Sequence, residues 1–466
     1  VPGRPVLHIL TYGEISDPRN TGLLKKLNPD GIIADECHAL RNQESARGDR
    51  FYRSFSEKPE TMYFGWSGTV IDKSIKDAAP QGSVALKEGS PWPRFGALID
   101  DLALQVDPVF DVNAFNTRTI PENTKWEKLK VTESTIADAL LRRVRETPGF
   151  ISSNQKSSCH AELNIAPRYV NIPSHIVEQM RNIDRLAERP DGEILKLALE
   201  KYQCMSQMAS GFFYRWRWPR NEPLEVRKVW LEARKEYFAE ARSHLGGEGK
   251  DSFKLLDLAA QRWHRGYLHT FGSGTEVYIK PYTKGPQPVW KSEHWKRWTE
   301  VKDTCKPEKE TVWQDKYLVE DAAEWARKHK KKPGVLWYYH EAFGAALQKA
   351  TGLKQFGPGD KASEELLKVT GEECIIASIG AHGTGKELQM FSEALVCNVP
   401  SSGAVWEQLL GRHHRQGQLS DEVNFEVYKH CDLYSDALDK ALLLSKFIEQ
   451  AQGSKQKLTS SANVMW

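Results

Sequence analysis

The 466-residue chain has no long apolar run. Its longest runs, such as Cys374 to Ile379, are far shorter than the roughly 20 residues that a membrane-spanning helix needs. No charged segment followed by an apolar one opens the sequence, as a secretory leader would. The sequence therefore predicts no membrane span, and we expect the protein in the cytoplasm, or in the host cytoplasm if its source is a virus.

Closely spaced cysteines are also missing. The seven cysteines are scattered, and no two of them form a Cys-x-x-Cys pair. This spacing argues against a zinc module and against a disulfide framework, so we expect reduced thiols in or near the cores. The sequence has no internal repeat of short period and no low-complexity tract.

Charge is small overall but unevenly distributed. The net charge is +3, whereas residues 211–332 hold 26 Lys and Arg against 18 Asp and Glu, a balance of +8 that leaves −5 for the remainder. The same segment carries nine of the fifteen tryptophans. Cationic and aromatic side chains together suit contact with nucleic-acid phosphates and bases. The alternative is a helical segment whose tryptophans form its own core, and we favour this alternative for most of them.

Short apolar runs near the start alternate with helical stretches, as in an α/β sheet. Residues 6–11, 31–35 and 61–66 are predicted as strands, residues 80–93 as a loop and residues 134–146 as an amphipathic helix. A long helical pattern follows over residues 174–245. A helix is expected from Asp251 and a loop or small hairpin over residues 272–290.

A second α/β series begins after the lysine run that ends at Lys332. Helices are predicted over residues 319–330, 341–350, 363–370, 405–413 and 435–452, with strands over 335–339, 374–379 and 423–428. The predicted fold class is α/β, with two lobes of parallel sheets flanked by helices and a mainly helical insertion between them. We place the first lobe at residues 1–150, the insertion and linker at 151–332, and the second lobe at 333–466.

Two carboxylates follow the apolar run that ends at Ala34. Asp35 and Glu36 stand at the carboxyl end of a predicted strand, where α/β folds bind ligands, and His38 follows two residues later. There Asp35 could hold Mg²⁺ and Glu36 could act as a general base on an attacking water. The alternative is an acidic cap at an ordinary corner between a strand and a helix.

Two arginines stand near the end of a predicted helix in the second series. Gln408, Arg412 and Arg415 have the spacing i, i+4 and i+7, which predicts one helical face from which both guanidinium groups can reach one phosphate. No acidic residue is close to them in sequence, so we disfavour the alternative that they serve ordinary salt bridges.

Taken together, the acidic pair and the paired arginines resemble superfamily 2 helicases, most closely the Swi/Snf-like DNA translocase branch, and in compactness the helicase-like proteins of bacteriophages. The resemblance implies two RecA-like lobes with an ATP site in the cleft between them. It also implies that Asp35 binds Mg²⁺, that Glu36 activates water, and that His38 couples the nucleotide site to the second lobe. Gln408, Arg412 and Arg415 would then act on the γ-phosphate.

Further segments resemble motifs of the same family. Ser67 and Thr69, in Ser-Gly-Thr, match a hydroxyl pair that relays nucleotide state. Thr11 and Tyr12 match a segment that touches the nucleic-acid backbone. The segment Ser378 to Gln389 matches a loop whose glycines, Gly383 and Gly385, let the backbone approach ATP, and whose Thr384 and Lys386 would contact nucleic acid.

The same segment also contains a false phosphate-binding loop. Residues 380–386 fit Gly-x-x-x-x-Gly-Lys, but Glu387 follows, which offers no hydroxyl to Mg²⁺, so we reject this motif as a Walker A loop. Nothing in residues 1–30 resembles Gly-x-Gly-Lys-Thr either. We read the chain as lacking the N-terminal part of the first lobe, and we expect these 466 residues alone to hydrolyse ATP poorly or not at all.

The leading functional prediction is an ATP-dependent translocase or helicase that acts on double-stranded DNA, with ATP and Mg²⁺ as ligands. One alternative is a catalytically incomplete nucleic-acid-binding module derived from a helicase. The other is an RNA helicase. The motifs do not specify strand separation, polarity, protein partners or oligomeric state.

Overall fold

The computed structural model divides the chain into two compact units. Unit 1 comprises residues 1–105, 147–149 and 217–308, and unit 2 comprises residues 106–146, 150–216 and 309–466. The structure describes residues 6–16, 20, 22–43, 45–92, 96–108, 136–151, 159–218, 220–244, 267–270, 276–279, 293–383 and 385–461.

Unit 1 contains a small parallel sheet. Strand β1 (Gly31–Ala34) pairs with β2 (Met62–Gly65), close to the predicted positions. Helix α3 (Ala46–Glu57) packs against the sheet, and its Phe51 and Phe55 surround Tyr63 with ring centroids 5.0 to 5.8 Å apart. Helices α1 (Tyr12–Ser16) and α2 (Leu23–Leu27) lie beside α3. The apolar side chains of α3 explain why one face of this sheet is buried.

Two predictions for this unit are wrong. Residues 6–11 form no strand, because a strand needs a neighbouring strand and no described strand pairs with this segment. The predicted loop at 80–93 instead begins with helix α4 (Ala79–Leu86), since Pro80 falls in the first turn, where a helix does not use its N–H groups. A Cβ on Gly82 would lie 2.5 Å from the Trp92 ring, so glycine is needed for this helix to pack there.

Unit 1 also contains the longest helix of the predicted insertion. Helices α9 (Leu224–His244) and α11 (Glu293–Val301) pack together around Trp230 and Trp298, each 5% exposed. These two tryptophans pack inward, as expected for most tryptophans of the segment. Strand β5 (Tyr267–Thr270) pairs antiparallel with β6 (Glu276–Ile279), within the range predicted as a loop or hairpin. The helix predicted from Asp251 lies outside the described residues.

Unit 2 is built on a six-stranded parallel sheet. The strand order is β3-β12-β11-β8-β10-β9. The strands are β3 (Glu162–Arg168), β8 (Gly334–Tyr338), β9 (Gln355–Phe356), β10 (Ile375–Ser378), β11 (Glu393–Val396) and β12 (Glu422–Tyr428). Every residue of β8, β10 and β11 is buried, which explains their near-continuous apolar sequences.

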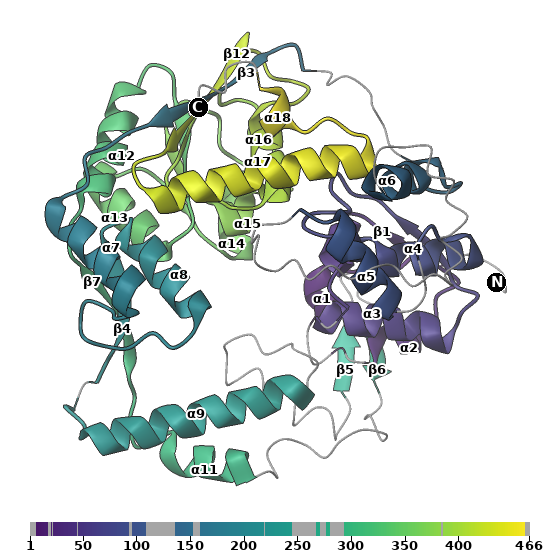
Figure 1. Cartoon of the computed structure of the whole chain (residues 1–466), viewed down its shortest axis with the longest axis horizontal. Helices are drawn as coiled ribbons and strands as arrows, with labels where there is room; N and C mark the ends of the chain where they lie inside the picture. The colour runs from purple at the N-terminus through teal and green to yellow at the C-terminus, as the bar shows by residue number, and fades with distance from the viewer. Residues whose placement is uncertain are drawn as a thin grey trace. The chain divides into compact units, whose positions relative to one another are not determined.

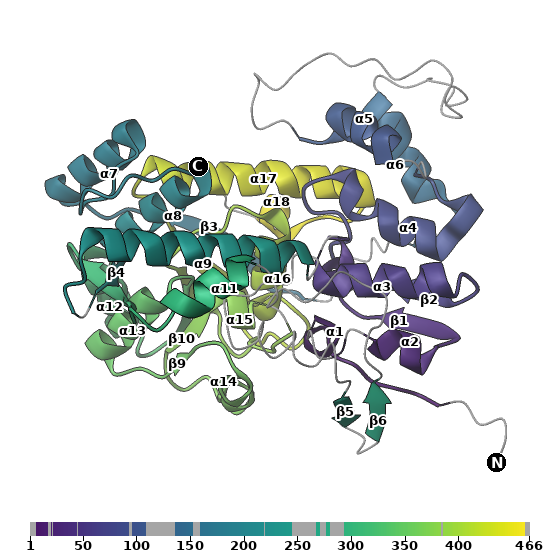
Figure 2. The ribbon, with the colours of Figure 1, turned by 90° about the horizontal axis from the view of Figure 1, so that it is seen from below.

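Helices cover both faces of this sheet. Helix α12 (Tyr317–Lys328) covers the face of Glu426, and α13 (Glu341–Thr351) lies beside it (Figure 2). Helix α16 (Gly403–His413) covers the other face, where the His413 ring lies 5.0 Å from that of Phe425. The long helix α17 (Asp432–Gln452) runs beside α16 and α18 (Lys457–Ser460) (Figure 1). Among the remaining elements are α5 (Gly96–Val106), α6 (Ile136–Glu146), α7 (Ser174–Leu186), α8 (Ala198–Met208), β4 (Phe212–Arg217), β7 (Glu308–Trp313), α14 (Asp360–Leu366) and α15 (Ile379–His382).

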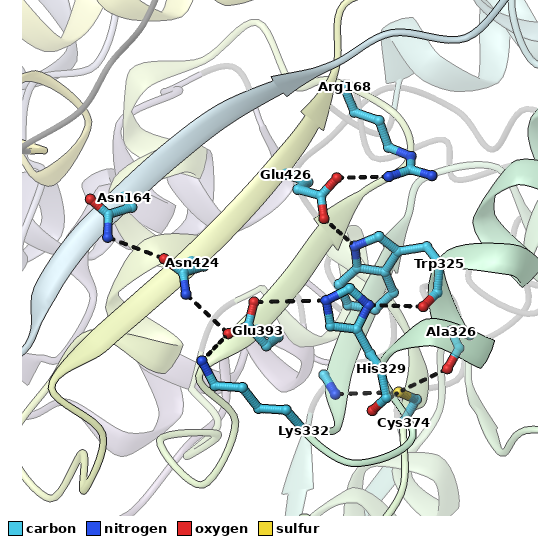
Figure 3. A network of polar contacts seen from close by, with 11 residues as sticks. Asn164, Arg168, Trp325, Ala326, His329, Lys332, Cys374, Glu393, Asn424 and Glu426 are labelled. Carbon is cyan, nitrogen blue, oxygen red and sulfur yellow. Dashed lines mark hydrogen bonds and ion pairs between the residues drawn. The ribbon is translucent and has the colours of Figure 1, made fainter.

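A polar network fixes α12 to the edge of the sheet (Figure 3). Arg168 of β3 binds Glu426 of β12 at 2.8 Å and Asp321 of α12 at 2.6 Å, and Trp325 Nε1 donates to Glu426 at 2.6 Å. Burial alone would raise the pKa of Asp321, but hydrogen bonds from Arg168 and Tyr428 lower it below the usual range. Strand β3 is thus part of this sheet, and helix α12 is bound to its edge.

The units differ from the predicted boundaries at residues 150 and 332. Strand β3 and helix α12 fall within the predicted insertion but belong to unit 2. The predicted α/β class, with parallel sheets flanked by helices, is confirmed. Within the described part of the chain, no helix is long and apolar enough to cross a membrane.

Candidate functional site

The acidic pair lies on a loop directly after β1. Glu36 has a left-handed backbone (φ 49°), and its N–H donates to Asp35 Oδ1 at 3.0 Å. The backbone hydrogen bonds that pair β1 with β2 continue past the ends of both strands. Trp66 N–H donates to Ala34 O at 2.9 Å, and Cys37 N–H donates to Trp66 O at 2.8 Å. The loop after β1 and the loop after β2 are therefore held side by side at the carboxyl end of the sheet.

His38 connects these two loops. Its Nδ1 lies 2.9 Å from Ser67 Oγ and 3.2 Å from Glu36 Oε2. The backbone N–H of Thr69 donates to Ser67 Oγ at 3.1 Å, while the Thr69 side chain is buried. The structure thus brings together Glu36, His38, Ser67 and Thr69, which the sequence analysis placed in two separate motifs.

Half-buried Tyr12 and buried Gln81 form hydrogen bonds with the backbone of the loop after β1. Tyr12 donates its hydroxyl hydrogen to Asp35 O at 2.6 Å, and Gln81 Nε2 donates to Cys37 O at 3.0 Å. Tyr63 in turn donates to Gln81 Oε1 at 2.9 Å. Burial raises the pKa of the Cys37 thiol to about 11, so it stays protonated at neutral pH and is a poor metal ligand. Gln81 was not predicted from the sequence, because nothing in its sequence context marks a contact 44 residues away.

Thr11 has a structural role in this fold. Its Oγ1 accepts from Glu14 N–H at 3.1 Å, and Glu14 Oε2 accepts from Thr11 N–H at 2.7 Å, which is the reciprocal pattern of a capping box at the start of α1. Tyr12 is engaged with the acidic loop. Thr11 and Tyr12, two of the four residues predicted to contact nucleic acid, therefore already form hydrogen bonds within unit 1.

The predicted Mg²⁺ ligand fits a simple magnesium site. Among the described residues no three His, Cys, Asp or Glu side chains form a metal-binding group. Mg²⁺ in phosphoryl-transfer sites is bound by one or two carboxylates, waters and substrate phosphates, so the exposed carboxylate of Asp35 is chemically compatible with it.

The second candidate segment is the loop that follows β10 and α15 in unit 2. Gly383 ends α15, and Gly385 has φ +70°, a conformation that favours glycine. Lys386 follows, whereas Thr384 lies outside the described residues. His382 is buried, and burial lowers its pKa, so the neutral ring donates from Nε2 to Gly357 O at 2.8 Å.

Arg412 lies on α16 and is only 8% exposed. Its guanidinium donates to Gly383 O at 3.2 Å, to Lys386 O at 2.9 Å and to Gln408 Oε1 at 2.7 Å. Arg412 and Gln408 therefore share a helical face, as predicted, and that face holds the loop after α15.

Arg415 does not share that helix. Helix α16 ends at His413, and His414 already has non-helical backbone angles, so the prediction of one face for all three side chains is wrong. His413, the last residue of α16, has a buried ring: the Trp337 indole N–H donates to His413 Nε2, and His413 Nδ1 therefore carries the proton that it donates to Phe391 O. Burial lowers the pKa of His413 to about 4.

Arg415 also has an acidic neighbour that its sequence context does not reveal. Its guanidinium lies 3.6 Å from Glu387 Oε1, and both side chains are partly exposed. The prediction that disfavoured a salt bridge was therefore wrong for Arg415, because the loop after α15 places Glu387 near the end of α16. Such an exposed pair contributes about 0 to 1 kcal/mol, so it does not hold the guanidinium firmly.

No protein-family model matches the sequence, and no curated protein matches it. The chain is similar to the solved structure of the C-terminal part of the Fun30 ATPase domain, with 11% identity and a TM-score of 0.27 over 63% of this chain and 99% of that one. It is also similar to T4 UvsW, with 14% identity and a TM-score of 0.22 over 29% of this chain and 33% of that protein. At these scores the similarities support no conclusion about function.

Proposed function

We propose that this chain is part of an ATP-dependent DNA translocase or helicase of superfamily 2, with two RecA-like lobes. The observation that carries the proposal is the position of His38, whose Nδ1 lies within hydrogen-bonding distance of both Glu36 and Ser67. Because the His38 ring contacts both the general-base candidate Glu36 and the loop after β2, a movement of Glu36 can be transmitted to Ser67. An ordinary acidic cap at a strand end requires no such link.

The side chains of unit 1 would act on the hydrolytic water. Glu36 would accept a proton as the water attacks the γ-phosphate, and its Oε2 lies 3.2 Å from His38 Nδ1. Asp35 would hold Mg²⁺, which when bound neutralises charge on the phosphates. The hydrogen bonds from Tyr12 and Gln81 to the loop backbone would keep both carboxylates in place.

Unit 2 would supply the positive charge. Arg415 is the partly exposed guanidinium of the predicted pair, and we propose that it contacts the γ-phosphate in exchange for Glu387. Such an arginine typically accelerates hydrolysis about 10³ to 10⁵-fold. The loop with Gly383, Thr384, Gly385 and Lys386 would contact nucleic acid.

The carboxyl end of the unit 2 sheet supports nucleic-acid binding, alone or with hydrolysis. The connections from β8 and β11 leave in opposite directions, and ligands bind at such switch points in parallel sheets. There Asn398 Oδ1 accepts from Tyr339 N–H at 2.8 Å, and the exposed fractions of Tyr339 and Tyr202 are 60% and 45%. Exposed aromatic rings stack on bases, so a binding module without hydrolysis is the second candidate function.

The decisive experiment compares ATP hydrolysis with and without duplex DNA for the protein as its gene encodes it and for the 466 residues alone. We expect DNA-stimulated hydrolysis in the encoded protein that falls at least about 10³-fold in Glu36→Gln and in Arg415→Ala. The 466 residues alone are expected to hydrolyse ATP poorly. Tyr339→Ala, which leaves both carboxylates in place, should weaken DNA binding by about fivefold or more.

The alternatives give different results in the same assay. Salt-sensitive DNA binding without hydrolysis in the encoded protein would favour the binding module. Stimulation by RNA in preference to duplex DNA would favour an RNA helicase. Hydrolysis that survives both substitutions would refute the roles given to Glu36 and Arg415.

A further inference from the structure

The guanidinium of Arg412 is directed at backbone rather than at solvent. Nε donates to Gly383 O and to Gln408 O, each at 3.2 Å, and one terminal nitrogen donates to Lys386 O at 2.9 Å. The other donates to Gln408 Oε1 at 2.7 Å, so Gln408 orients the planar group. Because Arg412 is only 8% exposed, a phosphate would have to displace these partners before it could contact the guanidinium.

Gly383 and residues 385–388 belong to neither a helix nor a strand. A Cβ on Gly383 would lie 2.5 Å from Ile379 O, and Gly385 has φ +70°, so both positions favour glycine. The far end of this loop is tied to the same helix, since Leu388 N–H donates to Arg412 O at 3.2 Å. One residue therefore fixes the loop through its side chain and its carbonyl group.

We propose that Arg412 is a positioning residue that holds the backbone of Gly383 and Lys386 in place for nucleic-acid binding, and that Arg415 alone contacts the phosphate. This inference rests on the proposed function only in taking nucleic acid as the ligand of the loop. The clamp itself follows from the hydrogen bonds above. Lysine cannot replace it, because a single ammonium group cannot reach two carbonyl oxygens and an amide oxygen in one plane.

The test measures two properties of the same variants. The first is hydrogen exchange of backbone amides in residues 383–391, and the second is affinity for a fluorescein-labelled duplex DNA. Arg412→Lys should speed exchange at least about tenfold, since it removes hydrogen bonds from a charged donor, and should weaken DNA binding by a similar factor. Arg415→Lys makes the same chemical change three positions away and should alter exchange by less than about twofold.

A milder variant guards against unfolding. Gln408→Met keeps Arg412 and removes only the amide oxygen that orients it, so it should shift both measurements in the same direction by less, with an unchanged circular dichroism spectrum. The proposal is overturned if Arg412→Lys leaves exchange unchanged, or if exchange rises while DNA affinity stays the same. It is also overturned if Arg412→Lys and Arg415→Lys weaken Mg²⁺–ATP binding equally without affecting exchange. If the wild-type protein binds no DNA, the proposed function fails, and the hydrogen-exchange result alone decides whether Arg412 positions the loop.

Discussion

The two parallel sheets of this protein are built from similar apolar sequences but are covered very differently. In unit 1, Ile33 of β1 and Met62 and Phe64 of β2 are 54 to 64% exposed, and only the other face packs on α3. In unit 2, every residue of β8, β10 and β11 is buried between helices. An apolar run therefore predicts a strand but does not tell how many of its faces are covered.

This difference also separates the two halves of the proposed chemistry. The carboxylates stand on the thinly covered sheet, where a few hydrogen bonds from Tyr12, Gln81 and His38 hold their loop. The arginines stand on the thickly covered sheet, where buried Arg412 and His413 fix the loop and the helix end. We therefore expect unit 2 to be the more stable unit and unit 1 to be the more easily deformed.

The largest expected effect is acid destabilisation confined to unit 2. Burial lowers the pKa of His340, His413 and His430 to about 4, against 6.5 in an unfolded chain. Below pH 6.5 the unfolded state therefore binds protons that the folded state cannot. Stability is full above pH 6.5 and falls as the pH drops towards 4, by on the order of 1 to 3 kcal/mol for each histidine. This loss is measured by unfolding the protein in denaturant at pH values between 7 and 4 and monitoring unit 2 by hydrogen exchange.

His413→Gln provides the control for this prediction. The substitution removes one titrating group, so the slope of unfolding free energy against pH should decrease by about one proton. A slope that is the same in the variant, or an equal acid loss in unit 1, would contradict the assignment. Among the described side chains of unit 1 none of the histidines is buried.

The next effect compares one substitution in both sheets. Phe425 of β12 is 1% exposed and Phe64 of β2 is 54% exposed. Phe425→Ala should lower the free energy of unfolding by about 3 to 5 kcal/mol, since it leaves a cavity beside His413, whereas Phe64→Ala should change it by less than about 1 kcal/mol. Urea unfolding of both variants measures the difference. Equal losses would show that the exposed face of β2 is covered in solution.

The smallest effect concerns the exposed ion pair at the candidate site. If Glu387 competes with a phosphate for Arg415, Glu387→Gln should tighten Mg²⁺–ATP binding by roughly twofold to fivefold, the range expected for an exposed pair. The gain should disappear in an Arg415→Gln background. Titration of a fluorescent ATP analogue measures it, with the exposed Glu422→Gln as the control. If the gain in affinity persists without Arg415, it comes from the loss of a negative charge near ATP and not from the release of Arg415.

Much of the fold could be predicted because burial and periodicity coincide in unit 2. Strands β8 and β12 and helices α12 and α16 lie within a few residues of their predicted positions. Strand β11 was missed, because it begins with the charged residue Glu393, which is buried through its contacts with Asn424 and Lys332. Strand β3 was missed because its pairing with β12 joins residues some 260 positions apart in the sequence.

The candidate site was less predictable than the fold. The positions of Asp35, Glu36 and Arg412 at the ends of elements could be read from the sequence. The contacts of His38 with Ser67 and of Arg412 with loop carbonyl groups could not, because they depend on how separate loops meet. The pairing of Arg415 with Glu387 was missed for the same reason.

The proposed function requires the loop after β1 and the arginine after α16 to act on one nucleotide. The most direct measurement is a structure of the gene-encoded protein with duplex DNA, Mg²⁺ and a non-hydrolysable ATP analogue. We expect Asp35 at the metal and the Arg415 guanidinium at the γ-phosphate of the same nucleotide, with Arg412 still bound to Gly383 and Lys386. A nucleotide that meets only one of these two side chains, or that takes Arg412 in place of Arg415, would contradict it.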